Sequence, residues 1–180
     1  VSHQSYPHKM LTGRKDAYLY EEHFEDVSGY SNPNESEHDF FTVGHTSTSV
    51  SLACGLAKAR DLNGEDGNVI AVIGDGSLSG GEALEGLDYA AELDGNFIIV
   101  VNDNDMSIAE NHGGLYGNLK LLRDTKGQAE CNLFRAMGLD YVYVDQGNDT
   151  ASLIDAFSQV KDSNKPVVVH INTLKGKGYA

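Results

Sequence analysis

Two short apolar runs, at residues 69–73 and 97–101, constrain the fold more than any other feature of this chain. Each run is continuous rather than alternating, which is typical of a strand buried on both faces of a parallel sheet. Residues 80–93 lie between the runs and carry apolar side chains at helical spacing. The segment therefore predicts a strand–helix–strand crossover. Both runs are far shorter than the roughly 18 residues of a membrane-spanning helix, so we expect no transmembrane role.

The same alternation continues along the chain. We expect helices at 48–62, 129–137 and 150–161, strands at 141–144 and 167–171, and a loop at 102–117. This order predicts the α/β class: an open, doubly wound, mostly parallel sheet with helices on both faces. Residues 1–41 are polar and lack a sustained apolar period, so we expect loops with at most short helices that cover another part of the domain.

The charge of the chain restricts its partners. Its 180 residues include 27 acidic and 13 basic side chains, for a net charge of −14. This charge opposes non-specific binding to nucleic acid or anionic lipid, so we expect neither nucleic acid nor a membrane as a partner. A bound phosphate must instead be held locally, by backbone amides, a metal ion or a single cation. We interpret the acidic stretch at 35–39 as a solvated face.

The two cysteines, Cys54 and Cys131, lie far apart and lack the spacing of a zinc site or a disulfide framework. We expect both to be small buried side chains in a reducing compartment, and we expect a cytoplasmic protein.

A carboxylate flanked by glycines follows the first apolar run. In Gly74-Asp75-Gly76, the glycines let backbone amides approach a phosphate, but the Asp75 carboxylate repels it unless a cation lies between them. Mg²⁺ suits this position because it prefers oxygen ligands and commonly bridges carboxylates to phosphates. Asn104 follows the second run and offers an amide oxygen. Because ligands bind beyond the carboxyl ends of such strands, the pattern predicts a clamp for a diphosphate and a metal.

This pattern resembles the thiamine diphosphate motif of transketolase-like enzymes, in which a Gly-Asp-Gly triplet is followed downstream by an Asn. Four blocks, in the same order and spanning almost the whole chain, further resemble the 1-deoxy-D-xylulose-5-phosphate synthase family. They are HQSYPHK at 3–9, GHTSTS at 44–49, NDNDMSI at 102–108 and KGKGY at 175–179. Residues 122–131 form a shorter segment than the insert that many members of the family carry there.

The resemblance implies an enzyme that condenses pyruvate with glyceraldehyde 3-phosphate and releases carbon dioxide, supplying isoprenoid, thiamine and pyridoxal precursors. It implies thiamine diphosphate and Mg²⁺ as cofactors, and a homodimer. It also implies that Asp75, Asn104 and the backbone carbonyl of Met106 bind Mg²⁺, that amides of Gly76 and Ser77 contact the diphosphate, and that Lys175 supplies a cation. The residues that the resemblance places at the cofactor are His3, Gly44, His45, Thr46, Gly76, Ser77, Asn104, Lys175 and Tyr179.

The remaining histidines have no partner visible in the sequence, and we interpret them as surface or locally hydrogen-bonded residues. They are His8, His23, His38, His112 and His170. His112 is the one that we expect nearest the site, because it lies in the loop after Met106.

The resemblance identifies residues 1–180 as a diphosphate-binding domain that is incomplete at its N-terminus, with the pyrimidine-binding and C-terminal domains outside the chain. Because the cofactor-activating glutamate of the family lies in a second domain, we expect the chain alone to be inactive. Two alternatives stay open. One is a transketolase or the N-terminal subunit of a transketolase, and the other is a non-enzymatic phosphate- or nucleotide-binding module on the same sheet.

Overall fold

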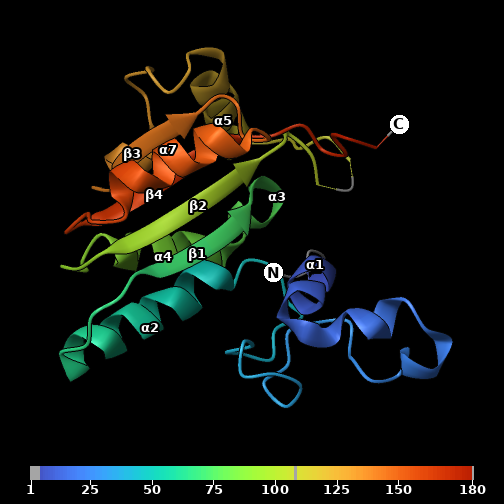
Figure 1. Cartoon of the computed structure of the whole chain (residues 1–180). Coiled ribbons are helices and arrows are strands. Elements are labelled where there is room, and N and C mark those ends of the chain that lie inside the picture. Colours follow the sequence, from blue (N-terminus) through green and yellow to red (C-terminus); the bar gives the residue numbers. More distant parts are fainter. Residues whose placement is uncertain (1–4, 108, 180) are drawn as a thin grey trace. The chain divides into compact units, whose positions relative to one another are not determined.

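The structure, a computed structural model, describes residues 5–107 and 109–179 and divides into two compact units, Val1–Thr48 and Ser49–Ala180. The second unit contains a four-stranded sheet in which all neighbouring strands are parallel (Figure 1). In spatial order its strands are β1 (Val69–Gly74), β2 (Phe97–Asp103), β4 (Pro166–Asn172) and β3 (Asp140–Val144). The predicted α/β class and the four predicted strands are confirmed.

Helices cover both faces of this sheet (Figure 1). They are α2 (Ser49–Asn63), α3 (Asp75–Leu78), α4 (Gly81–Ala90), α5 (Gly114–Asp124), α6 (Leu133–Ala136) and α7 (Thr150–Val160). On one face, Phe97, Ile99 and Val101 of β2 pack in a buried cluster with α2, α4, α5 and α6. On the other face, Ile98 and Val100 pack with α7. The alternation along β2 therefore explains why this strand reads as a continuous apolar run.

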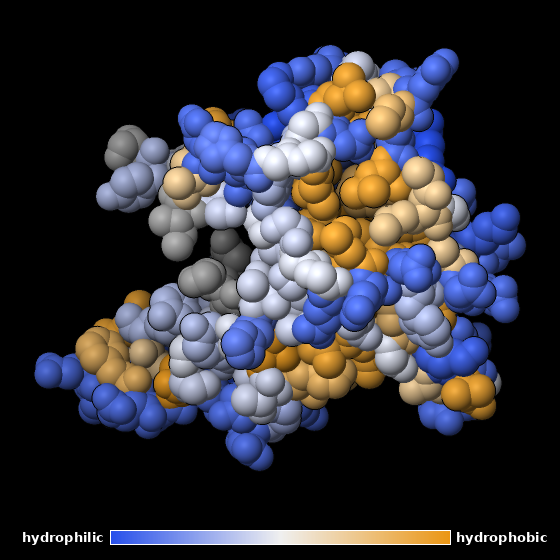
Figure 2. Space-filling view, turned by 180° about the vertical axis from the view of Figure 1, so that it is seen from behind, coloured by the Kyte–Doolittle hydropathy of each residue, from blue (hydrophilic) through white to orange (hydrophobic). Residues whose placement is uncertain are grey.

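The face of β1 on the α7 side carries exposed apolar side chains. Ile70 is 52% exposed and Val72 is 53% exposed, whereas Ala71 and Ile73, which point to the opposite face, are buried. The prediction that this strand is buried on both faces is therefore wrong for β1, because no helix of the described chain packs on this part of its α7-side face. Figure 2 shows that hydrophobic residues also reach the surface on the side opposite to the view of Figure 1, between larger hydrophilic areas. In the part of the chain that is described, no helix combines the length and apolar character that crossing a bilayer requires.

Two helical predictions were incomplete. Helix α5 starts inside the predicted loop at 102–117 and was missed, because glycines at its start hide the pattern formed by the fully buried Leu119 and Leu122. The predicted helix at 129–137 is reduced to the single turn of α6, where the side chain of Asn132 accepts hydrogen bonds from the first backbone amides. The bounds of both helices thus depend more on tertiary packing than on the local spacing of apolar residues.

The two cysteines differ. Cys54 is 2% exposed, as predicted, and burial raises the pKa of its thiol to about 11. The prediction is wrong for Cys131, which is exposed. Its position just before α6 leaves it at the surface, although the neighbouring Asn132 is buried.

The helical segments described in the first unit are short, as the sequence predicts. They are α1 (Ser5–Lys9), η2 (Met10–Arg14), η3 (Lys15–Tyr18) and η4 (Glu21–His23). Buried ion pairs hold these segments to the following loop: Lys9 Nζ lies 2.6 Å from Glu35 Oε2, and Arg14 Nη2 lies 2.8 Å from Asp39 Oδ1. The side chains of Lys9 and Asp39 are fully buried. The interpretation of 35–39 as a solvated face is therefore wrong for Glu35 and Asp39, which basic groups from the preceding segment neutralise, whereas Glu37 is exposed.

Acid should destabilise this first unit. Burial opposes the charged form of Glu35, but hydrogen bonds from Lys9 and Ser28 outweigh it and lower the pKa to about 2 from an ordinary 4.5. Arg14 similarly lowers the pKa of Asp39. A depressed carboxyl pKa contributes stability that is present above the ordinary pKa and is lost as pH falls through the folded-state pKa. We therefore expect loss of this unit between about pH 4.5 and 2.

Tyrosine circular dichroism against pH measures this loss, because Tyr6 and Tyr18 pack together in this unit with ring centroids 5.0 Å apart. Glu35→Gln removes one of the two titrating carboxyls and should make the loss with falling pH smaller. Identical profiles for the wild type and this variant would contradict the prediction.

Candidate functional site

Three loops meet at the carboxyl ends of the strands. Gly74 at the end of β1 pairs with Asn102 of β2, so the residues that follow them lie at one edge of the sheet. The Asn111 side chain donates to Asp75 Oδ2 at 2.8 Å, and the Ser107 hydroxyl donates to Asn111 Oδ1 at 2.6 Å. From beyond β4, Lys175 Nζ donates to the Ser107 carbonyl at 2.6 Å. Helix α3 after β1 and the loops after β2 and β4 are thus linked directly.

Asp75 is a buried carboxylate without a basic partner among the described residues. It is 2% exposed and accepts hydrogen bonds from Asn111 and from the backbone amides of Gly76 and Asn104. Burial, and then the charge of Asp103, raise the pKa of Asp75. A buried carboxylate normally needs a compensating cation. The environment of Asp75 therefore suits a metal ligand.

The loop after β2 borders a cavity of about 660 Å³. Its lining residues are Asn104, Asp105, Met106, Glu110, Asn111, His112, Gly113, Tyr116, Gly117 and Lys120. The amide oxygen of Asn104 accepts the Met106 N–H at 3.3 Å, so here it caps its own loop. His112 lines this cavity together with Asn104.

The three predicted metal ligands, Asp75, Asn104 and Met106, fit Mg²⁺ by the chemistry of their oxygen atoms. They supply one carboxylate, one amide oxygen and one backbone carbonyl, which are the oxygen ligands that this ion prefers. Among residues 5–107 and 109–179 there is no group of three or more His, Cys, Asp or Glu side chains placed to hold a metal. The predicted set contains a single residue of those types, so phosphate oxygens or water would have to complete the shell of a metal ion bound there.

Gly76 allows the loops after β1 and β2 to approach each other. A Cβ atom at Gly76 would collide with the Ser107 hydroxyl and lie 3.0 Å from the Ser107 Cβ, so a larger residue would require the Ser107 side chain to move. This close approach is a physical reason for glycine at the third position of the triplet. Ser77 follows in the short helix α3.

The other predicted cofactor residues are not all brought together. Lys175 contacts the site loop, whereas Tyr179 is 93% exposed near the end of the described chain. Gly44, His45 and Thr46 belong to the first unit, and His3 lies outside the described residues. Their roles at the cofactor stay predictions.

Sequence reasoning missed the buried polar residues behind the site. His170 is fully buried in β4, and its Nε2 lies 2.8 Å from Asp103 Oδ2, so of the two roles expected for it the surface role is wrong and the hydrogen-bonded role agrees with the structure. Arg123 of α5 donates to both oxygens of Asp103, at 2.8 and 2.6 Å. A histidine inside an otherwise apolar strand was the signal that could have indicated a buried partner.

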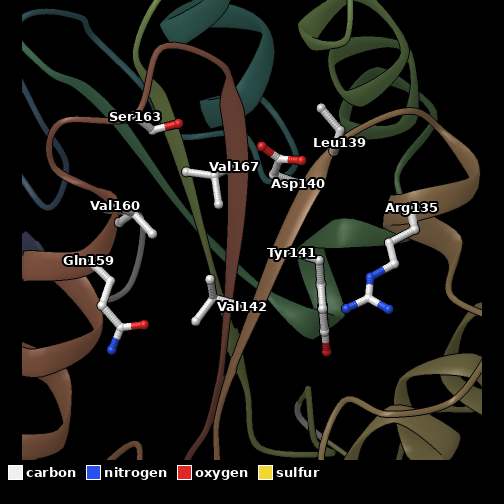
Figure 3. Close-up of a pocket in the computed structure, with 9 residues that line it drawn as sticks. All are labelled: Arg135, Leu139, Asp140, Tyr141, Val142, Gln159, Val160, Ser163 and Val167. Atoms are coloured by element: carbon white, nitrogen blue, oxygen red, sulfur yellow. The ribbon is translucent and has the colours of Figure 1, made fainter.

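A second cavity, of about 390 Å³, lies at the amino-terminal ends of β3 and β4, away from the strand ends that carry the first cavity (Figure 3). Its lining residues are Arg135, Leu139, Asp140, Tyr141, Val142, Gln159, Val160, Ser163 and Val167. The Arg135 guanidinium lies over the Tyr141 ring, 5.6 Å from its centroid, which is a cation–π contact within the fold. Because ligands of open α/β sheets bind beyond the carboxyl ends of strands, the first cavity is the candidate site.

Comparison with known proteins adds independent information. The profile of a family described as 1-deoxy-D-xylulose-5-phosphate synthase matches residues 1–132 and 120–173. A 1-deoxy-D-xylulose-5-phosphate synthase of Desulforudis audaxviator is 41% identical over 216 positions, which cover 100% of this chain and 34% of that protein. 1-deoxy-D-xylulose-5-phosphate synthase 1 of Geobacter metallireducens is 40% identical and is likewise covered over 34% of its length. The chain thus spans about a third of these relatives.

The aligned region is longer than this 180-residue chain, so the relatives carry residues that have no counterpart here. The two profile matches overlap at 120–132, which agrees with the short segment noted at 122–131. Among solved structures, an enzyme of Mycobacterium smegmatis described as thiamin diphosphate-dependent matches with a TM-score of 0.57 and 22% identity. The match covers 77% of this chain and 24% of that one, and it supports the fold. Because the family profile matches nearly the whole chain, this chain belongs to the 1-deoxy-D-xylulose-5-phosphate synthase family.

Proposed function

We propose that this chain forms the diphosphate- and metal-binding part of an enzyme that condenses pyruvate with glyceraldehyde 3-phosphate. The products are 1-deoxy-D-xylulose 5-phosphate and carbon dioxide. The observation that carries the proposal is the buried Asp75 carboxylate directly after β1, which has no basic partner among the described residues and lies beside the backbone amide of Asn104 directly after β2. Membership of the synthase family supports this activity over the transketolase and binding-module alternatives.

The residues of the chain have distinct roles in this proposal. Asp75, the Asn104 amide oxygen and the Met106 carbonyl hold Mg²⁺, and this charge neutralises the diphosphate. The absent side chain at Gly76 keeps the two loops close, and Lys175, anchored on the Ser107 carbonyl, supplies a positive charge nearby. Bound thiamine diphosphate supplies the electron sink for decarboxylation. A homodimer is part of the same proposal, and sedimentation of the full gene product tests it.

Calorimetry on the full gene product tests the cofactor assignment. We expect thiamine diphosphate to bind when Mg²⁺ is present and to lose measurable binding when Mg²⁺ is chelated. ATP titrated under the same conditions is the control ligand, and we expect it to bind far more weakly. Equal binding of ATP would favour the phosphate- or nucleotide-binding module, and binding independent of Mg²⁺ would contradict the metal site.

Product analysis with the same protein separates the two enzymatic candidates. Carbon dioxide release from pyruvate should depend on glyceraldehyde 3-phosphate, whereas turnover of ketose donors without decarboxylation would indicate a transketolase. We expect the 180-residue chain alone to show neither reaction.

A further inference from the structure

The loop that presents Asn104 is held from both sides by one arginine. Arg123 of α5 donates to both carboxylate oxygens of Asp103, and its Nη2 lies 2.5 Å from Asp105 Oδ1. Asp103 and Asp105 flank Asn104 directly in the sequence. The Asp103 side chain is fully buried and that of Arg123 is 12% exposed, so this contact is shielded from solvent. A planar guanidinium with several donors suits such a bridge, because it binds carboxylates with fixed geometry.

The backbone of the same loop has an unusual conformation. Asp105 has a φ of 63°, in the left-handed region that residues other than glycine seldom adopt. The Asp105 N–H donates to Asp103 Oδ1 at 3.1 Å, and the Met106 N–H donates to Asn104 Oδ1 at 3.3 Å. A conformation of this kind persists when its surroundings fix it. Here the contact of Arg123 with Asp103 and Asp105 spans the turn.

Asp103 is itself fixed from the sheet. His170 Nε2 lies 2.8 Å from Asp103 Oδ2, and the Tyr141 hydroxyl lies 2.7 Å from His170 Nδ1. The backbone carbonyl of Asp103 accepts the Thr173 N–H at 2.8 Å. The Asp103 carboxylate therefore contacts His170 of β4, which Tyr141 of β3 holds in turn, and Arg123 of α5 links it to Asp105. Other residues of α5, Tyr116 and Lys120, line the cavity that Asn104 borders.

We propose that Arg123 is a positioning residue for the cation site. By holding Asp103 and Asp105 together, it fixes the turn that places the Asn104 amide oxygen and the Met106 carbonyl. This inference rests on the proposed function, because the cation that these oxygens serve is the Mg²⁺ of that proposal.

The test compares Arg123→Gln and Arg123→Lys with Arg60→Gln in the full gene product. Arg60 is a matched control because it is also a buried arginine, but it bonds to the carbonyls of Gly67 and Asn96 at the far ends of β1 and β2. The first readout is Mg²⁺ affinity at a saturating thiamine diphosphate concentration. The second is amide hydrogen exchange of Asp105 and Met106 without ligand.

We expect Arg123→Gln to weaken Mg²⁺ binding by about 10- to 100-fold, the range typical for lost outer-shell support of metal ligands. The exchange of the Asp105 and Met106 amides should become faster, and Arg123→Lys should recover part of both losses. Arg60→Gln should lower the melting temperature without changing either readout. If Arg123→Gln does not fold, Asp105→Asn is the replacement. Its position is 59% exposed, and asparagine tolerates the left-handed backbone, so we expect a smaller loss in the same direction.

The outcomes separate the two proposals. A wild-type protein that binds Mg²⁺, together with an Arg123→Gln variant that binds it equally well, overturns the positioning role and leaves the proposed function intact. A wild-type protein that binds no Mg²⁺ with thiamine diphosphate overturns both. Equal losses of affinity in Arg123→Gln and Arg60→Gln would show general destabilisation and would also overturn the positioning role.

Discussion

Replacing Asp75 with Asn should remove the Mg²⁺ dependence of thiamine diphosphate binding together with most of the affinity. The carboxylate is the single charged group in the predicted ligand set, and it is buried beside the Asn104 backbone. Replacing a residue that only orients a metal ligand typically costs about 10- to 100-fold in metal affinity. Replacing the Asp75 ligand itself should therefore cost more than about 100-fold. Calorimetric titrations with and without Mg²⁺ measure the effect.

The same substitution should stabilise the protein when no cofactor is bound. Burial and the nearby Asp103 raise the pKa of Asp75, so the charged form is disfavoured in the folded state, and an amide of the same shape removes this penalty. We expect a higher melting temperature together with the lost affinity, a trade typical of functional sites. Asp88→Asn, at an exposed position of α4, is the control and should change neither quantity. Metal affinity retained in Asp75→Asn would refute the assignment of this ligand.

Truncating Phe134 should cause the largest loss of stability. Phe134 is fully buried in the cluster between the sheet and α5, and its ring stacks on Tyr141 with centroids 5.7 Å apart. A buried Phe→Ala change removes transfer free energy and leaves a cavity, which together cost about 3–5 kcal/mol of the free energy of unfolding. Because Phe134 also contacts His170, with ring centroids 6.2 Å apart, the cavity should loosen the support of Asp103.

Chemical denaturation of the second unit measures this loss. Ile154→Ala is the control, since Ile154 is 60% exposed on α7 and its truncation should change the free energy of unfolding by less than about 0.5 kcal/mol. A loss below about 1 kcal/mol for Phe134→Ala would mean that the position is not part of a close-packed core.

The strands and the metal motif could be predicted because local sequence determines them. Continuous apolar runs specify strands, of which β2 is buried on both faces and β1 on one, and the Gly-Asp-Gly triplet directly follows β1. The positions of Asp75 and Asn104 at the ends of neighbouring strands could therefore be predicted without any knowledge of side-chain packing. The resemblance to the synthase family rested on the same blocks and is confirmed by the profile match.

The support behind the site could not be predicted in this way, since it depends on pairing across long distances in the sequence. Arg123, His170 and Asp103 come from α5, β4 and β2, and nothing local marks them as partners. Helix α5 was missed because its glycine-rich start resembles a loop, and the acidic stretch at 35–39 was misread because Lys9 and Arg14 neutralise it from far upstream.

The order of the strands also determines the sequence of events when a ribosome makes this protein. Strand β1 can pair with β2 as soon as both have emerged from the ribosome. The other edge of β2 pairs with β4, and because Phe97 pairs with Pro166, this second pairing needs residues that are made about 70 positions later. Since chains fold as they are synthesised and distant pairings form slowly, the second edge of β2 stays open until nearly all 180 residues have been translated. A nascent chain that stalls before residue 166 therefore exposes an unpaired apolar strand, which is a target for chaperones.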